Sequence, residues 1–200
     1  MSDGMLVGGQ ALRTRTPLGA ELLTRGVLVQ VTNDPPRYER TVPDGTVEVF
    51  ELGDRPASQP GRRIFLTEVI DPQGHSVELT YDSSFRLVSI TDAIGQVTTF
   101  DYLDSGHPLA ITKVTDPFGR FATLAYDASG RLSNITDAIG IVSSVSYDAS
   151  SLVNVLTTPY GSSNFSYGLT AIGPGNNIIR WLELTDPLGN PERIEFSGYT

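Results

Sequence analysis

The sequence predicts an all-β protein in which antiparallel β-hairpins repeat along the chain and form a meandering sheet. Three observations lead to this fold class. One motif is written four times between Val69 and Leu156. The runs between its turns are short and alternate in polarity, and no comparable stretch keeps a 3.6-residue period. The chain of 200 residues also contains 20 glycines and 13 prolines, as frequent turns require.

Each copy begins with an acidic turn, Asp-(Pro/Ala)-x-Gly, followed by a short β-rich run. Aspartate suits the first position because its carboxylate accepts a backbone N–H two residues on, and glycine at the end tolerates positive φ. A three-residue insertion around Ser105–Pro108 makes the second copy longer than the others. A degraded fifth copy begins at Thr158 and a sixth at Asp186. The four complete turns have these first and last residues: Asp71 and Gly74, Asp92 and Gly95, Asp116 and Gly119, Asp137 and Gly140.

A second turn in the repeat follows a Tyr-Asp pair. We expect the tyrosine to pack at a strand end and the aspartate to cap the turn, with no catalytic role. Arginine after the turn glycine is expected to form a salt bridge or to shield a strand edge. The residues of this motif are Tyr81 and Asp82, then Tyr126, Asp127, Gly130 and Arg131, and then Tyr147 and Asp148.

The motifs divide the chain into three parts. Residues 1–37 form a poorly defined N-terminal segment, with a frayed start over Met1–Gly9, a short helical turn at Glu21–Leu23 and a strand at Val27–Val31. Residues 38–68 form a pre-repeat hairpin region, turning at Pro43-Asp44-Gly45 and ending in a strand that starts at Arg62. Residues 69–200 hold about six repeats, the last incomplete, interrupted by a loop at Gly168–Asn177 before a strand over Ile178–Thr185.

The quoted motif is similar to the YD repeat of the RHS family. The pattern Tyr-Asp-x-x-Gly-Arg-Leu, three residues, then Thr-Asp-x-x-Gly is complete once, at Tyr126–Gly140, and partial in the neighbouring copies. The family includes bacterial RHS polymorphic toxins, the B and C components of insecticidal toxin complexes, wall-associated surface proteins and teneurins. The resemblance covers roughly residues 69–190 and is absent from the first 40 residues.

The resemblance implies a long β-sheet that spirals into a hollow shell around a toxic C-terminal polypeptide. It also implies a secreted or cell-surface protein, although the first 30 residues lack the basic and apolar regions of a signal peptide. In the family an aspartate at the end of the shell releases the cargo by autoproteolysis. The segment around Asp186 resembles an ordinary repeat turn instead, so we assign no proteolytic role to that residue.

Composition excludes several classes of function. The chain has no cysteine, and its formal net charge of −9 gives no basic footprint for nucleic acid. No apolar run approaches the ~20 residues of a membrane-spanning helix. Neither His75 nor His107 accompanies a nucleophile elbow or an oxyanion loop, so we expect no enzyme activity. Stacked turn aspartates could collect Ca²⁺, but the glycine-rich nonapeptide of β-roll sites is absent, and we expect no metal and no cofactor.

The leading hypothesis is a non-catalytic, structural segment of an RHS-type β-shell that encapsulates or carries a toxin or effector polypeptide. About six repeats that stop without a cap have open sheet edges, so we expect partners to be further YD repeats or another copy of the chain. The alternative is a cell-surface adhesion module that binds glycan or protein through exposed strands and loops. Its basis is a regular series of tyrosines: Tyr81, Tyr102, Tyr126, Tyr147 and Tyr167.

Overall fold

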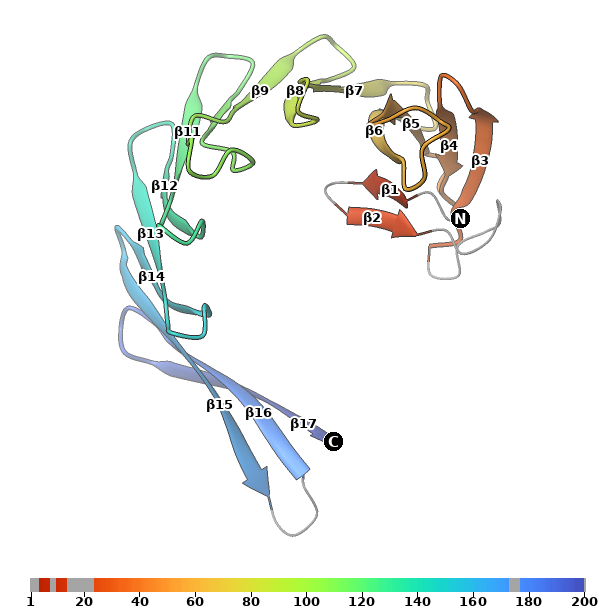
Figure 1. Ribbon diagram of the computed structural model, residues 1–200. Helices are drawn as coiled ribbons and strands as arrows, with labels where there is room; N and C mark the ends of the chain where they lie inside the picture. The colour runs from red at the N-terminus through yellow and green to blue at the C-terminus, as the bar shows by residue number, and fades with distance from the viewer. Residues whose placement is uncertain (1–3, 8–9, 14–23, 173–176, 200) are drawn as a thin grey trace. The chain divides into compact units, whose positions relative to one another are not determined.

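The computed structural model describes the backbone of residues 4–7, 10–13, 24–172 and 177–199, and the side chains of residues 24–170 and 179–196 (Figure 1). These residues form β-strands joined by turns, and none of them is helical. The strands are β1 Gly4–Val7, β2 Gln10–Arg13, β3 Val27–Thr32, β4 Arg37–Thr41, β5 Val47–Gly53, β6 Arg63–Ile70, β7 Ser76–Tyr81, β8 Leu87–Thr91, β9 Val97–Asp101, β10 Lys113–Thr115, β11 Phe121–Tyr126, β12 Leu132–Thr136, β13 Val142–Tyr147, β14 Val153–Thr158, β15 Gly161–Ile172, β16 Asn177–Thr185 and β17 Pro191–Tyr199.

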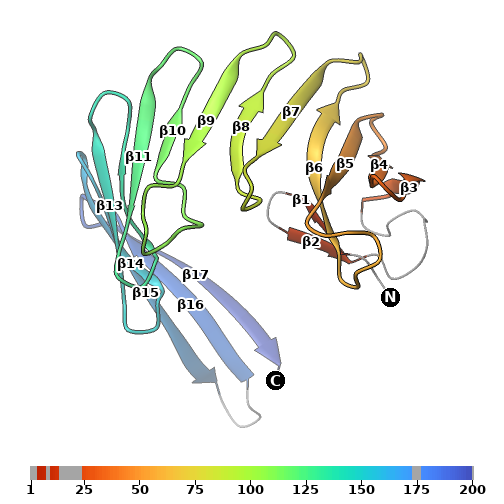
Figure 2. The ribbon, with the colours of Figure 1, turned by 45° about the horizontal axis from the view of Figure 1, so that its top comes forward.

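Strands that follow one another in the chain pair antiparallel with each other. This holds from β3 to β9 and again from β10 to β17, where the strands lie side by side in Figure 2. The predicted all-β fold of antiparallel hairpins is therefore confirmed. One pairing departs from it, because β1 lies parallel to β6 as well as antiparallel to β2.

The chain forms two compact units. One comprises residues 1–100 with 116–118, and the other comprises residues 101–115 with 119–200. The division of the chain at residues 37 and 68 that we drew from the sequence stays a prediction.

For the side chains that the structure describes, the hydrophobic core lies in the first unit, on strands β3 to β6. It consists of Leu28, Tyr38, Phe50, Ile64 and Leu66. These strands are rich in bulky apolar residues, and side chains from all four of them pack together in this cluster. Among the described side chains, none beyond residue 66 is fully buried. The repeats therefore form a single layer with both faces partly exposed.

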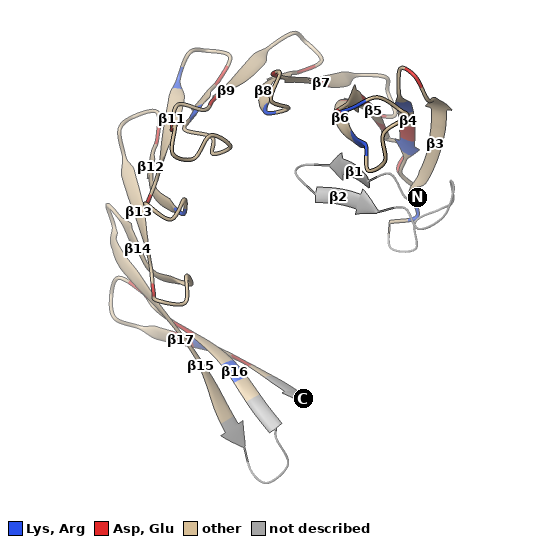
Figure 3. Cartoon of the chain, in the orientation of Figure 1, with Lys and Arg blue, Asp and Glu red and all other residues tan. Residues whose placement is uncertain are grey.

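The two faces of this layer differ in chemistry. In the second unit, the register places Leu124 opposite Ile135 and Val145 opposite Leu156, so these residues share one face. The other face carries threonine, serine and asparagine at alternate positions, together with apolar residues such as Val142 and Val155. Strands β12, β13 and β14 contain no charged residue and are uniformly tan in Figure 3. Strands β12 to β14 thus have one apolar face and one uncharged face of mixed polarity.

Two expectations from the sequence were wrong. The loop expected at Gly168–Asn177 is largely strand, since β15 continues to Ile172 and Gly168 pairs with Trp181 on β16. The glycine suggested a break, but the indole of Trp181 covers the space that a side chain at residue 168 would fill. The start expected to fray includes a paired strand at Gly4–Val7. The helical turn expected at Glu21–Leu23 lies outside the described residues.

Candidate functional site

The first turn of each repeat is built around its aspartate carboxylate. In the turn at Asp71, Oδ1 accepts hydrogen bonds from the backbone N–H groups of Gln73 at 2.8 Å and His75 at 2.9 Å. The N–H of Gly74 donates to the carbonyl of Asp71 at 3.0 Å, which closes the turn. The turns at residues 92, 137 and 186 repeat all three bonds. In the turn at Asp116, the N–H of Phe118 donates to Oδ1 at 2.9 Å.

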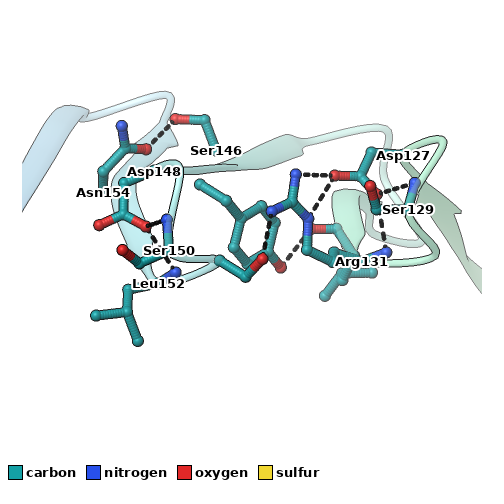
Figure 4. Close-up of polar contacts among 11 residues, drawn as sticks. Asp127, Ser129, Arg131, Ser146, Asp148, Ser150, Leu152 and Asn154 are labelled. Atoms are coloured by element: carbon teal, nitrogen blue, oxygen red, sulfur yellow. Dashed lines mark hydrogen bonds and ion pairs between the residues drawn. The ribbon is translucent and has the colours of Figure 1, made fainter.

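The second turn, which follows the Tyr-Asp pair, has the same geometry. Oδ1 of Asp127 accepts from the N–H groups of Ser129 and Arg131, each at 2.9 Å (Figure 4). The carboxylates of Asp82 and Asp148 make the equivalent bonds in their own turns. Both recurring aspartates of the repeat therefore perform one local task, because a carboxylate at the start of a turn satisfies backbone donors that would otherwise be unpaired.

The side chain four residues after the aspartate binds the second carboxylate oxygen where it can. Nε of Arg131 donates to Oδ2 of Asp127 at 2.8 Å, and Nε of Arg86 donates to Oδ2 of Asp82 at 2.7 Å. His75 and Asn190 take the same position against Asp71 and Asp186, each at 2.9 Å. Backbone hydrogen bonds and then these side-chain bonds hold the pKa of Asp127 below its usual value. A salt bridge at Arg131 was expected from the sequence. We did not predict that the residue four positions after a turn aspartate binds its carboxylate in several turns, although this spacing is visible in the sequence.

Three tyrosines each connect their own hairpin to the preceding one. The hydroxyl groups of Tyr81, Tyr126 and Tyr147 donate to the backbone carbonyls of Leu66, Ile111 and Leu132, at 2.7, 2.7 and 2.8 Å. Each acceptor lies 15 residues earlier in the chain, so the same bond recurs with the repeat. Burial raises the pKa of the Tyr126 hydroxyl. All three rings are half-buried, which places them within the sheet structure rather than on an open surface.

Arg131 extends the connection toward the next repeat. Its guanidinium carbon lies 4.5 Å from the centroid of the Tyr147 ring, and its Nη1 donates to Oγ of Ser151 at 3.1 Å. With its bond to Asp127, this one side chain contacts two successive turns (Figure 4). Tyr126, Asp127, Arg131 and Tyr147 are therefore brought together by the fold.

The two histidines are each occupied within their own turn. His75 pairs with Asp71, and Nδ1 of His107 lies 2.9 Å from Oδ2 of Asp104 in the inserted segment. The ring of His107 also covers Gly130, where an added Cβ would lie 2.8 Å from its Cδ2. Within the described residues, no group of three His, Asp or Glu side chains is placed to hold a metal ion. The same residues form no helix able to span a bilayer.

Comparison with known proteins identifies the repeats. The family model described as RHS Repeat matches residues 65–93, 86–123, 110–138 and 126–163. No curated protein matches the chain. Among solved structures, the chain is similar to one titled "Crystal Structure of TcdB2-TccC3-TEV", with 16% sequence identity and a TM-score of 0.31. That alignment covers 96% of this chain but only 12% of the other, so the chain spans a small part of that protein. The successive matches follow the same turns and tyrosines, and by its RHS repeats over residues 65–163 the chain belongs to the RHS-repeat family.

Proposed function

We propose that the chain is a non-catalytic wall segment of an RHS-type β-shell that encloses a toxin or effector polypeptide. The observation that carries this proposal is the bond from each Tyr-Asp tyrosine to a carbonyl of the preceding hairpin. Each of these bonds reaches 15 residues back along the chain to the preceding hairpin and adds to the strand pairing. The side chains that could act in catalysis have structural roles instead. The aspartates cap turns, and arginine and histidine side chains pair with them.

The single-layer sheet also supports an enclosing role. Its apolar face, with Leu124, Ile135, Val145 and Leu156, has no second layer within the described residues of its unit. An uncovered apolar face is unfavourable in water and favours contact with another apolar surface. In a closed shell the part of this face on β11 to β14 would meet the enclosed polypeptide, while further repeats would pair with the open strands. A protein with this role would be secreted or lie at the cell surface.

The alternative, an adhesion module, loses part of its basis. The hydroxyls of Tyr81, Tyr126 and Tyr147 donate to backbone carbonyls, and their half-buried rings pack within the sheet. These three residues therefore act in repeat stacking rather than as a platform for sugar rings. Adhesion through other exposed strands or loops is the competing hypothesis, and the experiment below distinguishes it from encapsulation.

The test is limited proteolysis of the native protein that contains these repeats, with cleavage sites identified by mass spectrometry. Encapsulation predicts that peptides of an enclosed segment resist protease until the repeats unfold. The double variant Tyr126→Phe, Tyr147→Phe should expose them earlier, at a lower denaturant concentration. If no segment is protected in the folded protein, the enclosing role is wrong. Binding of the 200-residue chain on a glycan array would then favour adhesion.

A further inference from the structure

Strands β15, β16 and β17 continue the apolar face of β11 to β14, because Leu156 pairs with Ser163 and the alternate residues of β15 follow on the same side. From residue 164 onward this face lies outside the part of the chain matched by the family model. The uninterrupted register of the three strands defines three cross-strand rows on it. Tyr167, Leu182 and Ile194 form the middle row. The flanking rows are Leu169, Arg180 and Phe196 on one side, and Phe165, Leu184 and Glu192 on the other. We call these nine residues the β15–β17 face.

Much of this face is exposed in the described structure. Leu169, Ile194 and Phe196 expose 69%, 70% and 67% of their surface, and Tyr167 exposes 39%. With aromatic side chains contributing on the order of 150–250 Å² when fully buried, these four residues present roughly 400 Å² together. A contiguous apolar patch of that size is typical of an interaction surface.

The opposite face of the same strands is already covered in part by its own side chains. The indole of Trp181 lies over Gly168, and the guanidinium of Arg193 lies 4.4 Å from the centroid of the Trp181 ring. Arg193 also pairs with Glu195 at 2.8 Å. The two faces therefore differ, and only the β15–β17 face combines high exposure with an apolar centre.

The charges on the face indicate what it binds. Arg180 and Glu192 lie in the two flanking rows, on opposite sides of the middle row. We propose that the partner is a second copy of this chain, packed face to face with its strands antiparallel to the first. The twofold axis then runs parallel to the middle row, at right angles to the strands and in the plane between the two sheets. It places the Arg180 row of each copy over the Glu192 row of the other.

The other arrangement with twofold symmetry has the strands of the two copies parallel. It would set Arg180 against Arg180, which is electrostatically unfavourable. The antiparallel arrangement matches opposite charges twice and keeps Leu182 at the centre of the contact. A sheet-on-sheet packing of this kind places the two layers about 10 Å apart. The apolar patch is about half of the ~800 Å² that each partner contributes to a standard interface, with the polar rim supplying the rest.

The first measurement is sedimentation equilibrium of the full chain between about 1 µM and 100 µM, where a specific dimer of ordinary affinity is resolved. We expect a monomer–dimer equilibrium. Ile194→Asp places a charge in the middle row and should raise the dissociation constant at least about 100-fold. Leu188→Asp is the matched control, because Leu188 is 87% exposed on a turn outside the face, and it should leave the constant unchanged. A chain that stays monomeric overturns the proposal, as does a dimer that tolerates Ile194→Asp.

The second measurement tests the arrangement with substitutions at exposed polar positions, which avoids dependence on the folding of Ile194→Asp. Arg180→Glu and Glu192→Arg should each weaken the dimer by about tenfold, since each creates two like-charge contacts. The double variant should restore the original constant, because the opposite charges face each other again. If both single variants bind as tightly as the original chain, or the double variant is weaker than either, the antiparallel pairing is wrong. Capture of a different polypeptide by a monomeric chain would assign the face to another occupant and overturn the proposal.

Discussion

At the scale of single residues, the two residues of the YD motif make different contacts. The aspartate makes a local contact and the tyrosine makes a long-range one. The aspartate acts within its own turn, where its carboxylate binds backbone N–H groups and the side chain after the turn. The tyrosine acts across the repeat, since its hydroxyl reaches a carbonyl 15 residues earlier. A change at the aspartate should therefore loosen one turn, whereas a change at the tyrosine should loosen the contact between two hairpins.

Tyr147→Phe removes one such contact and keeps the ring. We expect the free energy of unfolding to fall by about 1 kcal/mol, because the half-buried carbonyl of Leu132 loses its hydroxyl donor. Urea unfolding monitored by circular dichroism measures this difference. Tyr160→Phe is the control, since that residue is 87% exposed on a turn and should change stability by only a few tenths of a kcal/mol. Equal effects of the two variants would contradict the role assigned to the Tyr147 hydroxyl.

Ser151→Gly should stabilise the protein. Ser151 has φ of +64°, and the equivalent position in the preceding repeat is Gly130, with φ of +75°. Relief of the left-handed conformation is worth about 1 kcal/mol, and loss of the exposed bond from Arg131 to the Ser151 hydroxyl offsets a small part of it. Thermal unfolding measures the gain. Ser150→Gly, one position earlier, should give no gain, so a similar rise in both variants would contradict this explanation.

The lowered pKa of Asp54 should make the free energy of unfolding depend on pH in the acidic range. Burial alone raises the pKa of its carboxyl, but hydrogen bonds from Arg55 and Arg63 outweigh burial and lower the pKa to about 2. Because this lies below the unfolded value of about 3.9, the contribution is complete above about pH 4 and is lost as the pH falls toward 2. It amounts to at most roughly 2 kcal/mol.

The variant Asp54→Asn tests this dependence. Its stability should vary less between about pH 4 and pH 2 than that of the original chain, measured by urea unfolding at each pH. Asp44→Asn is a suitable control, because its exposed carboxyl accepts hydrogen bonds from Thr46 and not from an arginine of the described residues. The assignment fails if the original chain and Asp54→Asn lose stability in parallel.

At the scale of elements, β15 and β16 depend on a close contact between a glycine and a tryptophan. A Cβ added at Gly168 would lie 2.3 Å from Cζ2 of Trp181, so Gly168→Ala must displace the indole. We expect a loss of about 1–3 kcal/mol and a change in fluorescence from Trp181, which is the only tryptophan of the chain.

The matched control for this contact is Gly106→Ala. An added Cβ at Gly106 would meet only the Asp104 carboxylate at 3.3 Å, so it should leave tryptophan fluorescence unchanged. An unchanged spectrum for Gly168→Ala would show that the indole does not occupy this position.

At the scale of the whole molecule, stability is distributed unevenly along the chain. Val49, Phe50 and Ile64 are completely buried, whereas the described strands from β7 onward have no fully buried side chain. A repeat array is stabilised mainly by contacts between neighbours, so its hairpins can open locally at lower cost than the core.

Hydrogen exchange measures this difference directly. We expect the slowest backbone amides in β5 and β6, and faster exchange in β11 to β14. Phe50→Ala should remove about 3–5 kcal/mol from the first unit through the cavity it leaves. Its effect on the exchange of β11 to β14 should be small in comparison, because these strands do not contribute to that core. Uniform exchange across both groups of strands would contradict an uneven distribution of stability.

Local sequence patterns were sufficient to predict the all-β class, the turns and the period of the repeat. Turn formation depends on residues within about five positions, and aspartate and glycine at the first and last positions have local reasons to be there. The strand from Val27 and the hairpin around Asp44 could be predicted in the same way, from residue types and turn residues alone. The task of Asp127 and its pairing with Arg131 were likewise within reach.

The groups that meet across the repeats could be identified from the three-dimensional structure but not from local patterns. The carbonyls bound by Tyr126 and Tyr147, the stacking of Arg131 on the next tyrosine and the parallel pairing of β1 with β6 all join distant residues. The glycine at 168 was misleading for the same reason, because the tryptophan that covers it lies on the neighbouring strand. A local pattern sets backbone conformation, whereas such contacts depend on register and packing between strands, which no short stretch of sequence specifies.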